Sequence, residues 1–257
     1  MINWNSDQYL RFKNERTQPA VDLVNRVSLL HPMKIIDIGC GPGNSTRVLA
    51  DKFKEAYILG IDNSKNMIDK AMMQYPELAF KLYDIQNGVS TLDNDYDIVF
   101  SNACIQWVPH HTQLIKNLFS LLREGGALAI QIPINYCEPI DEIIRNISAS
   151  QKWKTFFNIP RVFHILTQNE YFDILSDLTQ SFFIWETAYY HIMKSHHAIL
   201  EWYRGTGLRP YLEALPQDRI KEYEDDVTKQ IIERYPVQKN GEVIFRFPRL
   251  FLLAYKQ

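Results

Sequence analysis

Three glycines alternate in the segment IDIGCGPGNST, at Gly39, Gly41 and Gly43, directly after a run of aliphatic residues. Glycine at a turn between a strand and a helix permits unusual backbone angles and close approach of a ligand. The first N–H groups of the following helix are also free to bind that ligand. Asp62 ends the next apolar run, in GIDNS, where a carboxylate can accept both hydroxyls of a ribose. The glycine loop and Asp62 together predict a site for a ligand with a nucleoside part.

The spacing of the glycines bears on which ligand that is. A dinucleotide-binding loop reads GxGxxG, whereas this loop reads GxGxG, with the third glycine one residue early and Pro42 stiffening the turn. The spacing therefore argues against a nicotinamide-dependent oxidoreductase, which stays open as an alternative, as does a protein that binds its cofactor without catalysis.

Two further predicted strands also end in residues that can bind a ligand. Asp84 and Ile85 close one of them, and Asn102 and Ala103 close the next. In open α/β sheets, ligands bind beyond the carboxyl ends of the strands. Asp84 is placed to accept a hydrogen bond from an adenine amino group. The alternative is that Asp84 and Asn102 are ordinary turn or cap residues.

The elements that position these residues alternate along the first half of the chain. Short apolar runs predict strands, and residues with an apolar face at helical spacing predict helices between them. The predicted strands are 33–39, 56–62, 78–85, 96–102 and 127–133, and the predicted helices are 20–27, 44–53, 64–76 and 114–122, the last ending at Gly125 and Gly126. This alternation predicts an α/β fold with a doubly wound, mostly parallel sheet.

Beyond residue 133 the alternation stops. Residues 138–180 and 195–235 have a largely helical pattern, 182–193 reads as a strand, and 242–256 reads as a final strand with an irregularity at Pro248. We expect one domain over 1–257 whose late helical insertions form a lid. Its parts are an N-terminal helical segment at 1–30, a cofactor-binding core at 31–133, lid insertions around a sixth strand at 134–240, and the final strand at 241–257.

Composition narrows the class of protein. With 46% hydrophobic and 23% charged residues the chain can build a core, and its net charge of −2 offers no overall attraction to nucleic acid or to an anionic membrane. No apolar stretch approaches the ~18 residues of a membrane span, and the polar N-terminus lacks a signal region. Three cysteines, Cys40, Cys104 and Cys137, form no CxxC pair, which favours a reducing, cytoplasmic location.

The loop DIGCGPGNST followed by GIDNS resembles the S-adenosylmethionine-dependent methyltransferases with a Rossmann-like sheet. Over the rest of the chain, WNSDQYLRF, ERTQPAVDLV, SNACIQWVPHH, AYYHIM, TGLRPYL and FPRLF are similar to the trans-aconitate 2-methyltransferase family, and the last three are the most specific. The resemblance implies a seven-stranded sheet with an antiparallel C-terminal strand. It also implies S-adenosyl-L-methionine as cofactor and S-adenosyl-L-homocysteine as product. The predicted cofactor-binding residues are Asp37, Gly39, Cys40, Gly41, Gly43, Asn44, Asp62, Asn63, Met67, Asp84, Ile85, Asn102 and Ala103.

The implied reaction is O-methylation of a carboxylate, which gives a methyl ester. A carboxylate with a pKa near ~4 is already ionised at neutral pH, so no general base is required and we expect no catalytic residue. Orientation of the reacting atoms in line can contribute roughly 7–11 kcal/mol. The absence of an obvious Ser-His-Asp or Cys-His arrangement in the sequence is consistent with this chemistry.

The resemblance implies a small polycarboxylate, such as trans-aconitate, as substrate, with no nucleic acid or membrane partner. Another small acid, or a carboxylate carried by an acyl carrier, is the alternative. Spectator carboxylates favour arginine partners because the guanidinium matches their geometry. The predicted substrate-binding residues are Arg209, Arg249, Tyr190, His191, Trp107 as a pocket wall, and Tyr9. His110 and His111 lack further ligands at metal-binding spacing, so no metal site is expected. The sequence does not indicate an oligomeric state or which carboxylate is methylated.

Overall fold

The computed structural model describes residues 13–136, 138–157 and 163–257. The chain divides into two compact units. The first contains Met1–Pro133, Phe163–Thr187 and Arg249–Gln257, and the second contains Ile134–Val162 and Ala188–Pro248. A single domain over 1–257 with a helical lid stays a prediction. Among the described residues, no helix has both the length and the apolar character needed to cross a membrane.

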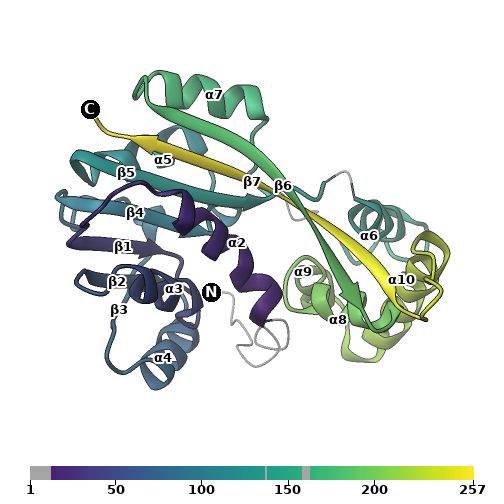
Figure 1. Cartoon of the computed structure of the whole chain (residues 1–257). Helices are drawn as coiled ribbons and strands as arrows, with labels where there is room; N and C mark the ends of the chain where they lie inside the picture. Colours follow the sequence, from purple (N-terminus) through teal and green to yellow (C-terminus); the bar gives the residue numbers. More distant parts are fainter. Residues whose placement is uncertain (1–12, 137, 158–162) are drawn as a thin grey trace. The chain divides into compact units, whose positions relative to one another are not determined.

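A seven-stranded sheet organises the chain, in the order β3-β2-β1-β4-β5-β7-β6. Its strands are β1 (Lys34–Ile38), β2 (Tyr57–Asp62), β3 (Ala79–Leu82), β4 (Tyr96–Asn102), β5 (Leu122–Pro133), β6 (Phe182–Met193) and β7 (Val243–Tyr255). Strands β1 to β5 pair in parallel, and β7 runs antiparallel to β5. The predicted α/β fold with a mostly parallel sheet and an antiparallel C-terminal strand is confirmed (Figure 1).

Helices of the first unit cover both faces of this sheet. They are α2 (Lys13–Arg26), α3 (Asn44–Lys52), α4 (Lys65–Gln74), α5 (His111–Ser120) and α7 (Gln168–Ser176), with short 3₁₀ helices η1 (Ile85–Asn87) and η2 (Ile105–Trp107). The strand order reverses direction at β1, so right-handed crossovers place α3 and α4 on one face and α5 on the other. Helix α2 packs against α3 and β5 (Figure 1).

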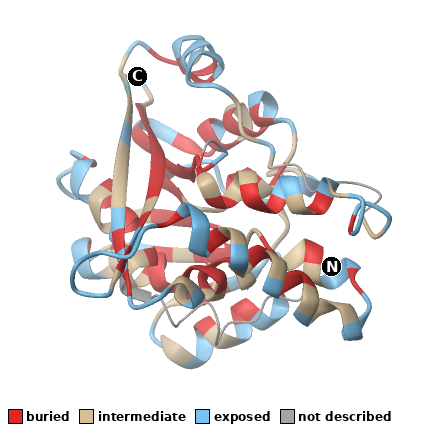
Figure 2. Ribbon diagram, turned by 90° about the vertical axis from the view of Figure 1, so that its right-hand side faces the viewer, coloured by how far each residue is buried: buried red, intermediate tan, exposed pale blue. Residues whose placement is uncertain are grey.

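The central strands are apolar because both of their faces are covered. In β1 and β4, seven positions are aliphatic or aromatic and fully or almost fully buried: Ile35, Ile36, Ile38, Tyr96, Ile98, Val99 and Phe100. Figure 2 shows this burial in the strands and the exposed outer turns of the helices. Polar residues in these strands are therefore exceptions that require partners.

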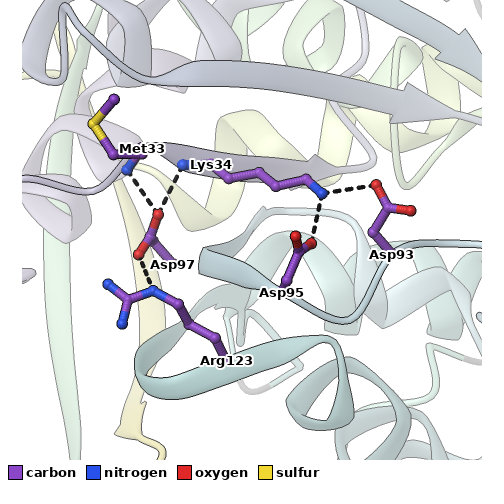
Figure 3. Close-up of polar contacts among 6 residues, drawn as sticks. All are labelled: Met33, Lys34, Asp93, Asp95, Asp97 and Arg123. Atoms are coloured by element: carbon purple, nitrogen blue, oxygen red, sulfur yellow. Dashed lines mark hydrogen bonds and ion pairs between the residues drawn. The ribbon is translucent and has the colours of Figure 1, made fainter.

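One such exception, Asp97, ties together the amino-terminal ends of β1, β4 and β5 (Figure 3). Its Oδ2 accepts hydrogen bonds from the backbone N–H groups of Met33 and Lys34, at 2.7 and 2.8 Å, and its other oxygen pairs with Arg123. The Lys34 ammonium lies between Asp93 and Asp95, whose hydrogen bonds raise its pKa. This end of the sheet is thus closed by ion pairs, which leaves the carboxyl ends of the strands for binding.

Two predicted boundaries were wrong. Helix α5 ends at Ser120 rather than at the two glycines, because Leu122 already pairs with Tyr96 in the sheet. The glycines instead lie within β5, where Gly125 donates its N–H to the carbonyl of Lys256 at 3.0 Å. Strand β3 ends at Leu82, so Asp84 and Ile85 follow the strand instead of closing it.

The second unit contains α6 (Pro139–Ala149), α8 (His196–Arg204), α9 (Arg209–Ala214), the 3₁₀ helix η3 (Gln217–Arg219) and α10 (Ile220–Arg234). Aromatic side chains fill its core, such as Trp153 and Tyr223, whose rings meet edge-on at 5.1 Å. Strand β7 passes through Pro248 without interruption, but its pairing with β5 begins only at Arg249. The predicted irregularity at Pro248 thus corresponds to the point where the ladder between β5 and β7 starts.

Candidate active site

Asp62 holds the glycine loop in place at the end of β2. Its Oδ2 accepts a hydrogen bond from the Gly41 N–H at 3.0 Å, and its Oδ1 accepts one from the Ser64 N–H at 2.8 Å. Burial raises the pKa of Asp62, and the nearby Asp84 adds to this, while the two backbone hydrogen bonds oppose it. Each carboxylate oxygen has a second lone pair. The side chain can therefore keep the loop closed and still accept hydroxyl groups from a ligand.

Glycine occupies the three loop positions for different physical reasons. All have positive φ, at 71° for Gly39, 54° for Gly41 and 87° for Gly43. A Cβ at Gly39 would overlap the side chain of Cys104, and one at Gly43 would lie 2.9 Å from the ring of Tyr75. A Cβ at Gly41 would have nothing within 4 Å. The atoms that come close to Gly39 and Gly43 therefore belong to the protein's own side chains. Gly41, in contrast, faces open space.

Asp37 is a fully buried carboxylate on β1, two residues before Gly39. Its Oδ2 accepts hydrogen bonds from the hydroxyls of Ser45 and Thr46 at the start of α3, both at 2.7 Å. Its Oδ1 has no donor among the described residues. Burial raises the pKa of Asp37 to about 6. A cation brought against Oδ1 would stabilise the ionised form, so this oxygen suits the ammonium group of an amino-acid ligand.

A helix cap follows β3, and a residue with positive φ follows β4. Asp84 accepts a hydrogen bond from the Gln86 N–H at 3.0 Å and so caps η1. This is the cap role that was expected from the sequence as the alternative to a ligand contact. Asn102 is the last residue of β4, and its Oδ1 has no donor among the residues that the structure describes. Ala103 has a φ of 53°, unusual outside glycine, and its N–H bonds to the Gln131 carbonyl at 3.0 Å.

The remaining predicted cofactor residues surround the same loop ends. Cys40, Asn44, Met67 and Ile85 are buried, and Asn63 is exposed. Burial raises the pKa of the Cys40 thiol, so it stays protonated and packs as a small apolar side chain. Cys40 and Cys104 are free, and Cys137 lies outside the described residues. Their roles in cofactor binding stay predictions.

Strand register places a row of polar side chains on one face of the sheet. Asp37 is opposite Gly60 of β2 and Phe100 of β4, Asn102 is opposite Gln131, and Gln131 is opposite Phe251. Paired residues share a face, as do residues two apart in a strand. The row that shares the face of Asp37 consists of Asp62, Asp37, Asn102, Gln131 and Arg249. The first four lie at or near the carboxyl ends of their strands.

One member of this row, Gln131, extends the predicted site and lies beside the predicted residue Arg249. Arg249 is almost fully buried, and its Nη1 lies 3.5 Å from the Oε1 of Gln131. Sequence reasoning missed Gln131. The signal was a polar residue inside the apolar run ALAIQIP, where a buried strand otherwise carries aliphatic side chains.

Trp107 and the two histidines lie beyond β4. The ring of Trp107 packs against Phe163 at 4.7 Å, consistent with either a pocket wall or a packing role. His111 is buried between the hydroxyl of Tyr171, 2.6 Å from Nδ1, and the Ile105 carbonyl, 2.8 Å from Nε2. Desolvation lowers the pKa of His111. Among the described residues, no three His, Cys, Asp or Glu side chains gather as metal ligands.

The other predicted substrate residues lie in the second unit, except Tyr9, which lies outside the described residues. Tyr190 is 61% exposed, whereas His191 is buried and stacks on Trp202 at 4.8 Å. Because side chains alternate along β6, only His191 of these two neighbours faces the interior. Arg209 begins α9 and pairs through Nε with Glu213 at 2.6 Å.

Comparison with known proteins identifies the family. Residues 35–126 match the family model described as a methyltransferase domain. The chain is 39% identical over 259 residues to the trans-aconitate 2-methyltransferase of Variovorax paradoxus (strain S110), covering 100% of both chains. It is 40% identical over 254 residues to that of Escherichia coli O45:K1 (strain S88 / ExPEC), covering 99% of this chain and 98% of the relative. This chain belongs to the trans-aconitate 2-methyltransferase family.

Solved structures resemble the chain in fold. The YcgJ protein of Bacillus subtilis superposes with a TM-score of 0.61 at 14% identity, over 93% of this chain and 99% of that one. The Haemonchus contortus phosphoethanolamine N-methyltransferase 2, bound to phosphomonomethylethanolamine and S-adenosylhomocysteine, superposes with a TM-score of 0.56 at 15% identity, over 93% and 53%. At these identities the likeness concerns the architecture alone.

As a member of the trans-aconitate 2-methyltransferase family, the chain is an S-adenosylmethionine-dependent methyltransferase. The site fits this cofactor in two respects. The Asp37 Oδ1 is a buried acceptor without a donor among the described residues, which suits the ammonium of the methionine part. Gly41 has open space above its Cα where a side chain would intrude. That Asp62 accepts the ribose hydroxyls stays a prediction.

Proposed function

We propose that this protein methylates a carboxylate of a small polycarboxylic acid, with trans-aconitate as the substrate, and forms a monomethyl ester. The observation that carries the proposal is the full-length identity of 39–40% to relatives named for this reaction. The buried Arg249 in the middle of β7, opposite Pro133 at the carboxyl end of β5, supports it, because a buried guanidinium favours an anionic ligand.

When bound, S-adenosylmethionine supplies an electrophilic methyl group on a sulfonium sulfur. The chain's own task is to hold a substrate carboxylate oxygen in line with that methyl group, so that a new O–CH₃ bond replaces the S–CH₃ bond. Because the substrate oxygen is ionised at neutral pH, no proton has to be removed. Orientation is then the main contribution of the protein.

Spectator carboxylates require fixed cations within the protein. Arg249, which approaches Gln131 through Nη1, is proposed to bind one of them. Arg209, which pairs through Nε with Glu213, is proposed to bind another, because a guanidinium matches the geometry of a carboxylate. Tyr190, His191, Trp107 and Tyr9 are proposed to complete the substrate contacts, and Trp107 to limit the entry of water. A cytoplasmic location is part of the same proposal.

A panel assay tests the proposal. The purified protein is incubated with S-adenosylmethionine and a set of small di- and tricarboxylates, an acyl-carrier-bound carboxylate and a monocarboxylate, and ester formation is read by mass spectrometry. Methylation of trans-aconitate with the highest kcat/KM supports the proposal. Preference for the acyl-carrier-bound acid, or no product from any polycarboxylate, contradicts it.

Arginine variants then test the residues. Arg249→Ala and Arg209→Ala should each raise KM for the acid by about 10- to 100-fold, since each removes a charge-assisted hydrogen bond of roughly 1.5–3 kcal/mol. Arg249→Lys should recover only part of the loss, because an ammonium lacks the guanidinium fork. Arg47→Ala, on the exposed side of α3 where Arg47 pairs with Asp51 and Glu77, is the matched control. Wild-type KM in both alanine variants would show that these arginines do not bind the substrate.

A further inference from the structure

The orientation of the Gln131 side chain follows from its neighbour. Gln131 is fully buried on β5, and its Oε1 lies 3.5 Å from Nη1 of Arg249. A guanidinium carries donors and no acceptor, so the amide atom that faces it must be the oxygen. The amide nitrogen therefore points away from Arg249. Of the two possible orientations of the amide group, only this one places an acceptor beside the guanidinium.

That nitrogen is a buried donor without an acceptor among the described residues. Buried amide donors in folded proteins almost always have a partner, supplied by protein, water or ligand. Replacing Gln131 with a leucine or methionine would suit the apolar strand better, since its neighbours Ile130 and Ile132 are aliphatic and buried. The amide therefore serves something other than the packing of the strand.

The surroundings of this donor define a ligand of a particular kind. Asn102, the register partner of Gln131 on β4, shares its face and has an Oδ1 without a donor among the described residues. On the other side, Phe251 is the register partner on β7 and stacks on Trp185 at 4.9 Å. The face thus presents a guanidinium, an amide donor and an amide acceptor in succession, beside a flat apolar surface. A planar acid with more than one polar end matches this sequence of groups.

We propose that Gln131 is a specificity-determining residue for the acid substrate. Its Oε1 holds the Arg249 guanidinium, and its Nε2 donates a hydrogen bond to the same substrate carboxylate that Arg249 binds, one oxygen for each donor. Gln131 thereby selects acids that place a second carboxylate here over acids that lack it. This inference rests on the proposed function, because it assumes that the acceptor is a small polycarboxylate.

The test uses two substitutions and a control. Gln131→Met keeps the length of the side chain but removes both amide atoms, and Gln131→Glu places a carboxylate beside Arg249. Gln113→Met makes the same chemical change on the exposed face of α5, where the Gln113 amide donates to Asn117 at 2.7 Å. For each variant, kcat and KM are measured for trans-aconitate and for a dicarboxylate that lacks one of its carboxylates, together with the affinity for S-adenosylhomocysteine and the Tm.

We expect Gln131→Met to raise KM for the tricarboxylate by about 10- to 100-fold and to change KM for the dicarboxylate much less, so that the preference between them falls. Its Tm should stay close to that of the wild type, because the loss of the buried unpaired donor offsets the loss of the long 3.5 Å contact to Arg249, and S-adenosylhomocysteine affinity should be unchanged. Gln131→Glu should reject the tricarboxylate even more strongly, through like-charge repulsion. Gln113→Met should behave as the wild type.

The proposed function and the role of Gln131 are contradicted by different results. If the wild type methylates no polycarboxylate, the proposed function fails and Gln131 loses its role with it. If the wild type methylates trans-aconitate and Gln131→Met retains its KM and its preference, only the role of Gln131 is wrong. A Gln131→Met variant that lowers Tm strongly would point to a structural amide, and Gln131→Glu then decides: unchanged selectivity there also overturns the inference.

Discussion

The side chain of Cys104 occupies the space where a side chain of residue 39 would begin. A Cβ at Gly39 would overlap both Sγ and Cβ of Cys104, whereas a Cβ at Gly41, two residues on, would meet nothing within 4 Å. Both glycines have positive φ, so the conformational preference for glycine is common to the two positions. The loop therefore separates a glycine packed tightly against the protein from a glycine that faces open space.

This separation predicts opposite consequences for two alanine substitutions. Gly41→Ala should fold with a loss of about 1–2 kcal/mol from its left-handed backbone, yet bind S-adenosylhomocysteine more weakly. Gly39→Ala adds the overlap with Cys104 and should be clearly less stable than Gly41→Ala. Chemical denaturation and calorimetric titration of both variants measure this. Equal stability of the two variants would show that the contact with Cys104 is easily relieved.

Asp62 is predicted to connect loop closure with cofactor binding. Asp62→Asn retains the shape of the side chain but replaces one of the two oxygens that accept from the N–H groups of Gly41 and Ser64, and it removes the charge proposed to bind the ribose hydroxyls. We expect S-adenosylhomocysteine affinity to fall by roughly 10- to 100-fold, equivalent to about 1.5–3 kcal/mol, in a folded protein. Isothermal titration against the wild type checks this, and an unchanged Kd would refute the ribose assignment.

Asp37 should make stability and binding depend on pH in opposite directions. Burial raises its pKa from the ordinary 3.8 to about 6, so the folded protein without cofactor holds this proton more tightly than the unfolded chain. Stability from this group is present below about pH 4 and is lost as pH rises to about 6, by up to about 3 kcal/mol. S-adenosylhomocysteine affinity should instead rise through the same range, as the carboxylate ionises and accepts the ligand's ammonium.

Asp37→Asn separates these effects. The neutral amide should remove this contribution to the pH dependence, stabilise the cofactor-free protein at pH 8 and weaken cofactor binding there. Thermal unfolding and ligand titration at several pH values, with wild type and variant side by side, provide the measurement. A variant that binds S-adenosylhomocysteine as tightly as the wild type at pH 8 would remove Asp37 from the cofactor site.

The opposite end of the sheet should affect stability alone. Asp97→Ala leaves the N–H groups of Met33 and Lys34 and the Arg123 guanidinium without their buried acceptor, so unfolding free energy should fall by about 3 kcal/mol or more. Asp93→Ala removes only an exposed partner of Lys34 and should change stability by less than about 1 kcal/mol. Urea titration tests both, and a small effect of Asp97→Ala would show that water replaces the carboxylate.

Much of this architecture was readable from the sequence because its signals are local. Apolar runs that end in Gly39, Asp62 and Asn102 predicted strands whose carboxyl ends meet, and the parallel order followed from the alternation with helices. The reasons why positions 39 and 43 require glycine could not be predicted from the sequence, because the side chains that contact them, Cys104 and Tyr75, come from distant parts of the chain.

Gln131 shows a second limit of the sequence. A single polar residue in ALAIQIP carries no spacing signal, and its meaning depends on the register that sets it beside Asn102 and near Arg249. The end of α5 was misplaced for a related reason. Leu121 and Leu122 continue the helical pattern, but the pairing of Leu122 with Tyr96, which is long-range, begins the strand there.

The reaction itself is tested most directly by following the methyl group. Wild-type protein is incubated with trans-aconitate and S-adenosylmethionine carrying a ¹³C-labelled methyl, and the products are separated and analysed by mass spectrometry and NMR. The label should appear as one methyl ester on the acid, in equal amount to the S-adenosylhomocysteine formed, and should be released as methanol by mild alkali. Label that stays on S-adenosylmethionine, or that appears on carbon or nitrogen of another acceptor while trans-aconitate is unchanged, would contradict carboxylate methylation by this protein.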